Sequence, residues 1–231
     1  MKISFHNSIE EISGESWDAL IGDLNYPFLK HDFLKTLEIT NCVGTNTGWI
    51  PIHITLKRGE ELIAAMPLYL KSHSQGEFVF DHSWANAFYQ HGLDYYPKLV
   101  SSIPHTPASG PRFLLKEGEE KSVLFEKIKE GVKMISSKNN ISSWHILFPE
   151  KDEINFYENS QLSIRKNAQF IWFNKNYKNF GNYLENFRSR HRKNVLKEKR
   201  EIKSSKKNSS TKDQLKEYKQ LFEEGLITQE E

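Results

Sequence analysis

Residues 49–71, WIPIHITLKRGEELIAAMPLYLK, decide the fold class of this chain. Apolar residues dominate both sides of the central Arg58-Gly59-Glu60. A glycine flanked by charged residues between two apolar runs is typical of a hairpin turn. We therefore predict two antiparallel strands, one on each side of this turn.

The hydrophobic pattern outside the hairpin predicts helices and strands in a mixed order. Apolar residues at helical spacing indicate helices, and short apolar runs between breakers indicate strands. A mixed order with an antiparallel start argues for an α/β or α+β layered sheet. The expected elements are strands at 2–6, 76–81, 98–103, 111–116, 143–148 and 168–173, and helices at 15–24, 31–40, 84–92, 119–137 (with Val123, Leu124, Ile128 and Val132 inward), 151–160 and from 180 onward.

The composition indicates a globular protein with a sizeable core. Of its 231 residues, 37% are hydrophobic and 13% aromatic, which suits one large domain or two modest ones. The chain has no apolar run of about 18 residues and no signal peptide at its start, MKISFHNSIEEI. Cys42 is the single cysteine, which excludes an intramolecular disulfide and a Cys-cluster zinc site. We expect a cytoplasmic protein without a metal.

The net charge of +2 hides a basic block at residues 188–207, RSRHRKNVLKEKREIKSSKK. The block holds ten Lys/Arg and two Glu, so the rest of the chain is about −6. On a helical wheel, Tyr183, Leu184, Phe187, Val195 and Ile202 form one apolar stripe, with basic residues opposite. The basic face is either solvated or in contact with an anion, such as a nucleic-acid backbone.

Five strings resemble one protein family. It is the FemAB-like peptidoglycan biosynthesis/recognition family of the GNAT superfamily of N-acyltransferases. The strings cover most of residues 28–203: TGWIPIHI (47–54), PLYLKSHSQGEFVFDHSWANAF (67–88), YYPKL (95–99), PHTPASGPRFL (104–114) and QFIWFNKNYKNFGNYLENFRSRHRKNVLKEKR (169–200).

The resemblance implies a GNAT-like mixed sheet flanked by helices. Fem-like proteins contain two GNAT-like halves, and this chain resembles the first half and the start of the second. We expect a first GNAT-like domain at 1–165 and the opening strand and basic helix of a truncated second one at 166–207. A linker (KSSKKNSSTK, 203–212) and a helical tail resembling the start of a SHOCT motif complete the chain, as a third region at 208–231. This organisation suggests a truncated or fused gene product.

The implied activity is acyl or aminoacyl transfer to an amine acceptor, peptidoglycan-related, in an enzyme or an inactive fragment of one. The implied partners are a small-molecule or muropeptide acceptor and, through the basic helix, tRNA. Acyl-CoA and aminoacyl-tRNA are the candidate donors. However, KEGEEKS (116–122) does not match the Q/R-x-x-G-x-G/A loop that holds the pyrophosphate of acetyl-CoA. The alternative is a non-catalytic protein that binds substrate or forms oligomers, using its basic helix and helical tail.

The segment SHSQGEFVFD, residues 72–81, places ionisable side chains among aromatic ones. His73, Glu77 and Asp81 are the catalytic candidates. One of them would remove a proton from the acceptor amine, because burial can raise the pKa of a carboxyl toward neutrality. Alternatively, the three form a hydrogen-bonded network that fixes the Ser74–Gly76 turn.

A second group of residues is expected to bind substrate. Basic residues at strand ends and on the basic helix can hold a phosphate or carboxylate, and an arginine can do so with two parallel hydrogen bonds. The alternative is ordinary surface charge, and for the tryptophan a place in the core. The candidates are Lys71, Ser74, Trp84, Lys98, Arg112, Arg190 and Lys193.

Overall fold

The structure, a computed structural model, describes residues 1–22, 26–166 and 172–208. The chain divides into two compact units, Met1–Asn167 and Ala168–Glu231, which are described separately.

The first unit contains two four-stranded sheets. One has the order β1-β3-β4-β7 and is antiparallel throughout; the other has the order β2-β5-β6-β8, in which β6 and β8 run parallel. The strands are β1 (Lys2–His6), β2 (Trp49–Pro51), β3 (His53–Arg58), β4 (Glu61–Met66), β5 (Tyr69–Lys71), β6 (Lys98–Ser101), β7 (Leu114–Leu115) and β8 (Trp144–Ile146).

The predicted hairpin at Gly59 is confirmed, but each of its arms contributes to both sheets. One arm passes from β2 into β3 and the other from β4 into β5. A proline lies at each crossing, Pro51 and Pro67, and proline has no N–H with which to continue a ladder. The Ile52 N–H still donates to the Leu68 carbonyl at 2.8 Å, so the two arms stay paired between the sheets.

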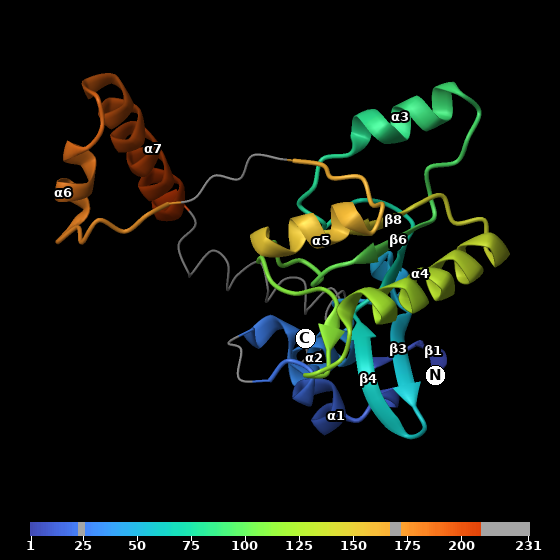
Figure 1. Cartoon of the computed structure of the whole chain (residues 1–231). Coiled ribbons are helices and arrows are strands. Elements are labelled where there is room, and N and C mark those ends of the chain that lie inside the picture. Colours follow the sequence, from blue (N-terminus) through green and yellow to red (C-terminus); the bar gives the residue numbers. More distant parts are fainter. Residues whose placement is uncertain (23–25, 167–171, 209–231) are drawn as a thin grey trace, which may run out of the picture. The chain divides into compact units, whose positions relative to one another are not determined.

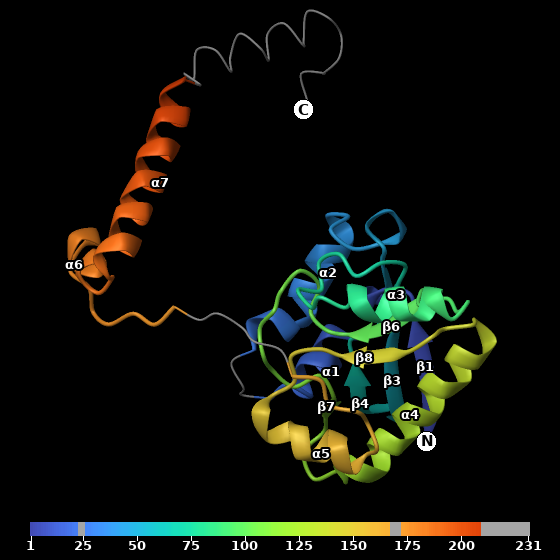
Figure 2. The ribbon, with the colours of Figure 1, turned by 90° about the horizontal axis from the view of Figure 1, so that it is seen from above.

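Helices cover both faces of the β1-β3-β4-β7 sheet (Figures 1 and 2). On one face, Leu124, Phe125 and Ile128 of α4 pack against the strands, and on the other Trp17 and Leu34 do so. This is the layered α/β arrangement that the sequence predicted. The helices are α1 (Gly14–Ala19), α2 (His31–Ile39), α3 (His82–Gln90), α4 (Lys121–Lys138) and α5 (Ile154–Asn159), with short 3-10 turns at Ile9–Glu11, Pro27–Leu29, Thr45–Thr47 and Lys151–Glu153.

Two predictions for the first unit are wrong. Residues 76–81 form no strand; they are a loop in which Phe78 has a φ of 57°, outside the β region. Val123 of α4 does not face inward but is 45% exposed, and Phe125 takes its place in the core.

In the described part of the second unit, residues 172–208, two helices lie where one was predicted, α6 (Phe180–Glu185) and α7 (Ser189–Asn208). The Arg192 side chain explains the break, because its guanidinium donates to the carbonyls of Leu184, Glu185 and Phe187 and so satisfies the end of α6. Helix α7 extends to residue 208, so the first half of the predicted linker is helical. The helical tail predicted at 208–231 and most of the strand predicted at 168–173 lie outside the described residues; Trp172 and Phe173 are irregular.

Candidate functional site

The loop before α3 folds over a buried lysine. Lys98, at the start of β6, donates from Nζ to Glu77 Oε2 at 2.8 Å, to Asp81 Oδ2 at 2.5 Å and to Ser74 Oγ at 2.8 Å. The side chains of Lys98, Glu77 and Asp81 are all 0% exposed. Four of the residues selected from the sequence therefore meet in one network.

Two tyrosines complete this network. Tyr95 donates from its hydroxyl to Asp81 Oδ2 at 2.8 Å, and the Tyr96 hydroxyl lies 2.7 Å from Ser74 Oγ. We call this group the Lys98 cluster; its members are Ser74, Glu77, Asp81, Tyr95, Tyr96 and Lys98. The two tyrosines were not selected from the sequence, although the YYPKL string places them just before Lys98.

The two carboxyls of the cluster differ in their electrostatics. Burial raises the pKa of Glu77, and the attraction of Lys98 offsets only part of this effect. Burial also acts on Asp81, but hydrogen bonds from Lys98, Ser74 and Tyr95 outweigh it and lower the pKa of Asp81. Glu77 Oε1 and Asp81 Oδ1 are buried and have no hydrogen-bond partner among the described residues.

Lys71 and His73 lie beside the cluster. Lys71 is buried with its Nζ 3.9 Å from the centre of the Trp49 ring, and it donates to the Gln75 carbonyl at 3.1 Å. Burial lowers the pKa of Lys71 to about 8. His73 is partly exposed. Its pKa is lowered mainly by partial burial and less by repulsion from Lys71, so its ring is neutral at pH 7.

The hydrogen bonding of His73 restricts its role. The Gln75 N–H lies 3.2 Å from His73 Nδ1, which must accept, so Nε2 carries the proton in the neutral ring. To act as a base through Nδ1, His73 would have to give up this bond. Of the three catalytic candidates, it is nevertheless the one that solvent reaches, because Glu77 and Asp81 are sealed in the cluster.

Arg112 is placed away from the cluster and is fully buried. Its guanidinium donates to the carbonyls of Leu147 (2.8 Å), Gly110 (3.0 Å), Pro111 (3.3 Å) and Ala108 (2.5 Å). Burial lowers the pKa of Arg112 to about 10. With four of its five donors on backbone carbonyls, this side chain holds the loop before β7, an arrangement that favours the structural reading over anion binding.

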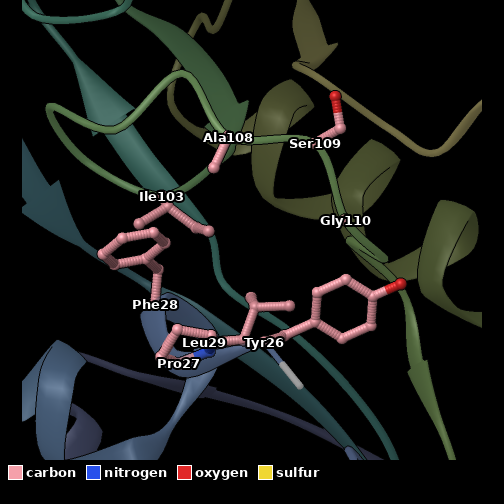
Figure 3. Close-up of a pocket in the computed structure, with 8 residues that line it drawn as sticks. All are labelled: Tyr26, Pro27, Phe28, Leu29, Ile103, Ala108, Ser109 and Gly110. Atoms are coloured by element: carbon pink, nitrogen blue, oxygen red, sulfur yellow. The ribbon is translucent and has the colours of Figure 1, made fainter. Parts of the chain in front are cut away.

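The loop that Arg112 holds also lines a small pocket of about 190 Å³ (Figure 3). Phe28 and Leu29 face Ile103 and Ala108 across it, and Tyr26 lies beside Gly110. The lining is mostly apolar, and the Tyr26 hydroxyl hydrogen-bonds to Glu150. This pocket was not predicted from the sequence, since it joins two loops about 80 residues apart.

Trp84 is 53% exposed on α3 rather than part of the core. The Arg165 guanidinium lies 5.7 Å from the centre of its ring. The indole is thus open to solvent, and its role in substrate binding stays a prediction.

The remaining two candidates, Arg190 and Lys193, lie on α7 of the second unit and are exposed. At about 100° per residue, Arg190, Lys193, Lys197 and Arg200 fall within an arc of about 80°. They form a cationic stripe along one side of the helix. Lys197 also lies 3.8 Å from Glu201, an exposed pair of little energetic weight.

The start of α4 does not suit a pyrophosphate. The residue before the helix is Glu120, which makes no side-chain capping hydrogen bond, and Glu119 just before it pairs with Arg58 at 2.7 Å. These acids oppose the anion binding that a helix N-terminus otherwise favours. The geometry therefore does not fit acyl-CoA at this position.

Two absences hold for the described part of the chain. There, no group of three or more His, Cys, Asp or Glu side chains is arranged to hold a metal ion. Within the same residues, no helix has the length and apolar character needed to cross a bilayer.

Residues 8–221 match the model of a family described as peptidoglycan biosynthesis/recognition, FemAB-like. No curated protein matches the chain. Among solved structures, the chain is similar to an aminoglycoside 6'-N-acetyltransferase of Acinetobacter haemolyticus (9% identity, 76% of this chain and 98% of that one, TM-score 0.44). It is also similar to a ribosomal-protein-alanine N-acetyltransferase of Brucella melitensis (7% identity, 75% and 100%, TM-score 0.45). Similarities at these identities and TM-scores do not indicate the function of this chain.

Proposed function

The chain belongs to the FemAB-like family of peptidoglycan biosynthesis/recognition proteins, and we propose that it transfers an acyl or aminoacyl group to an amine of a peptidoglycan-derived acceptor. The family match over residues 8–221 is the observation that carries this proposal. In the reaction, the amine nitrogen forms a bond to the acyl carbon, the bond to the donor's leaving group breaks, and the amine loses a proton.

We assign different roles to the three candidate residues in this proposal. Glu77 and Asp81 are positioning residues, because Lys98 holds both and neither reaches solvent. His73 is the candidate for contact with the acceptor or its proton, because it is partly exposed and neutral at pH 7. Among the donors, aminoacyl-tRNA is favoured over acyl-CoA, since acids flank the start of α4 and the cationic stripe of α7 suits a phosphate backbone.

The experiment is a transfer assay with the whole chain and a muropeptide acceptor, read by mass spectrometry. Acetyl-CoA and an aminoacyl-tRNA are supplied in separate arms. His73→Ala and His73→Asn form the informative pair, because asparagine can still accept the Gln75 N–H but cannot act as a base. If His73 handles the proton, both variants lose about 100-fold or more in kcat. If it only fixes the turn, His73→Asn keeps its activity and the assignment fails.

A second candidate function is recognition of the acceptor without transfer. The burial of Glu77 and Asp81 favours it, because the two carboxylates that sequence analysis selected for catalysis cannot touch a substrate in this arrangement. Muropeptide binding with no product in either donor arm would support recognition and refute the transferase proposal.

A further inference from the structure

In residues 77–81, the usual pattern of buried apolar and exposed charged side chains is reversed. The two acids are buried, while Phe78 is 57% and Phe80 is 79% exposed. Trp84, one turn into α3, is 53% exposed. We call Phe78, Phe80 and Trp84 the aromatic shelf. Exposed large aromatic side chains gathered on one short segment mark an interaction site rather than ordinary surface.

Lys98 and Arg165 hold the backbone of the shelf in place. Glu77 and Asp81 bind the same Nζ of Lys98, so both ends of the Phe78–Phe80 segment are tied to one buried atom. Arg165 donates to the Phe80 carbonyl at 2.6 Å. Phe78 has a φ of 57°, a conformation that a bulky residue seldom adopts. A pinned and strained loop that displays aromatic rings loses little conformational entropy when a ligand binds.

The charged side chain in contact with the shelf, Arg165, is positive. Within residues 72–91, the acids are Glu77 and Asp81, and both are buried. The exposed Arg165 lies over the Trp84 ring, and Lys166 follows it in the chain. A ligand on the shelf therefore meets flat aromatic faces and a cationic edge.

We propose that the aromatic shelf binds an acidic amino-sugar ring, with the sugar's C–H face on the aromatic rings and its anionic group at Arg165. The proposal rests on the proposed function and specifies the part of the acceptor that the first unit reads. A flat aromatic face can pack against the C–H face of a sugar ring, and the Arg165 guanidinium, 5.7 Å from the centre of the Trp84 ring, supplies a cation for the sugar's anionic group. The anion is either a carboxylate or a phosphate.

The test measures binding of three matched sugars to the full chain by ligand-observed NMR. N-Acetylglucosamine is neutral, N-acetylmuramic acid adds a carboxylate, and N-acetylglucosamine 1-phosphate adds a phosphate. The variants are Phe80→Ala, Trp84→Ala and Arg165→Gln. Tyr89→Ala is the matched control, because Tyr89 is 54% exposed on the same helix but is rotated by about 140° from Trp84.

The expected results separate stacking from charge recognition. Phe80→Ala and Trp84→Ala weaken binding of all three sugars by about tenfold, since each removes one aromatic contact. Arg165→Gln abolishes the preference for whichever acidic sugar the native chain binds more tightly, and any loss through the hydrogen bond to the Phe80 carbonyl affects the neutral sugar equally. Tyr89→Ala changes none of these values.

Several results would overturn the proposal. These are no binding of any sugar, binding unaffected by Phe80→Ala and Trp84→Ala, or a charge preference that survives Arg165→Gln. Failure of the proposed function is distinguishable from these results. Sugar binding that depends on the shelf, together with no transfer in either donor arm, would retain the shelf and reject the transferase. Transfer at a rate that the shelf variants leave unchanged would retain the transferase and reject the shelf as the sugar-binding site.

Discussion

Replacing Lys98 by methionine would remove the cation that Glu77 and Asp81 share. The substitution preserves most of the side-chain volume, so the main effect is electrostatic. Removing one partner of a buried ion pair costs about 3–5 kcal/mol because the other charge stays buried and unpaired. Lys98→Met leaves two such carboxyls, each with one oxygen that already lacks a partner. We expect the free energy of unfolding to fall by about 4 kcal/mol, which lowers the Tm by roughly 10 °C.

Urea denaturation followed by circular dichroism provides the measurement, and two further variants provide the controls. Lys116→Met removes a lysine from a pair with Glu61 whose side chains are 45% and 52% exposed, and it should cost less than about 1 kcal/mol. The triple variant Lys98→Met, Glu77→Gln, Asp81→Asn leaves no unpaired charge. It should therefore recover part of the loss.

The pH dependence of Lys98→Met follows from the same reasoning. Without the lysine, the folded-state pKa of both carboxyls rises relative to the native chain, because the attraction of Lys98 no longer opposes the effect of burial. The folded state then binds protons more readily, and the deficit shrinks as the pH falls toward 4. If Lys98→Met costs no more than Lys116→Met, or if the triple variant is no more stable than Lys98→Met alone, then the Lys98 cluster does not depend on the buried cation.

Three other predictions concern different parts of the molecule. Arg112→Met should lower the free energy of unfolding by about 3 kcal/mol in urea denaturation, because several buried carbonyls lose their donor; a loss below 1 kcal/mol would contradict the loop-holding role. Burial lowers the pKa of His145 from its ordinary 6.5 to about 4, so the unfolded chain binds this proton first and stability falls as the pH drops from 6.5 to 4. His145→Asn should flatten that decline, by up to about 3 kcal/mol, in urea midpoints measured across the window. Replacing Arg190 and Lys193 together by glutamine should reduce the slope of log K against log salt for tRNA binding by nearly 2, and an unchanged slope would remove the cationic stripe from the contact.

The hairpin and the layered α/β class were predictable from sequence because they depend on local signals. A glycine turn between apolar runs and a helical repeat of apolar residues each act within about 20 residues. The division of the hairpin arms between two sheets was not predicted. Pro51 and Pro67 marked the crossings, but a proline can also end a strand.

The site was harder to predict because its acidic side chains are buried and its aromatic side chains are exposed. Alternating acids and aromatics at 76–81 are typical of a strand with its aromatic face inward. In the structure, Lys98 binds the acids from about 20 residues away, so they are buried and the aromatics are exposed. Four of the residues that meet were predicted from the sequence, Tyr95 and Tyr96 were not, and only the fold shows which side chains face solvent.

The hairpin across both sheets also bears on how the chain folds. Its β3 and β4 strands are joined by a two-residue turn, whereas the pairs β1–β3, β4–β7 and β6–β8 join residues about 45 to 55 apart. Closing those long loops costs entropy that only an existing partner strand can offset. We infer that the hairpin forms first and serves as the template for both sheets. Mutations in β3 and β4 would then slow folding, with φ-values well above those in β7 or β8, whereas uniform φ-values would contradict this order.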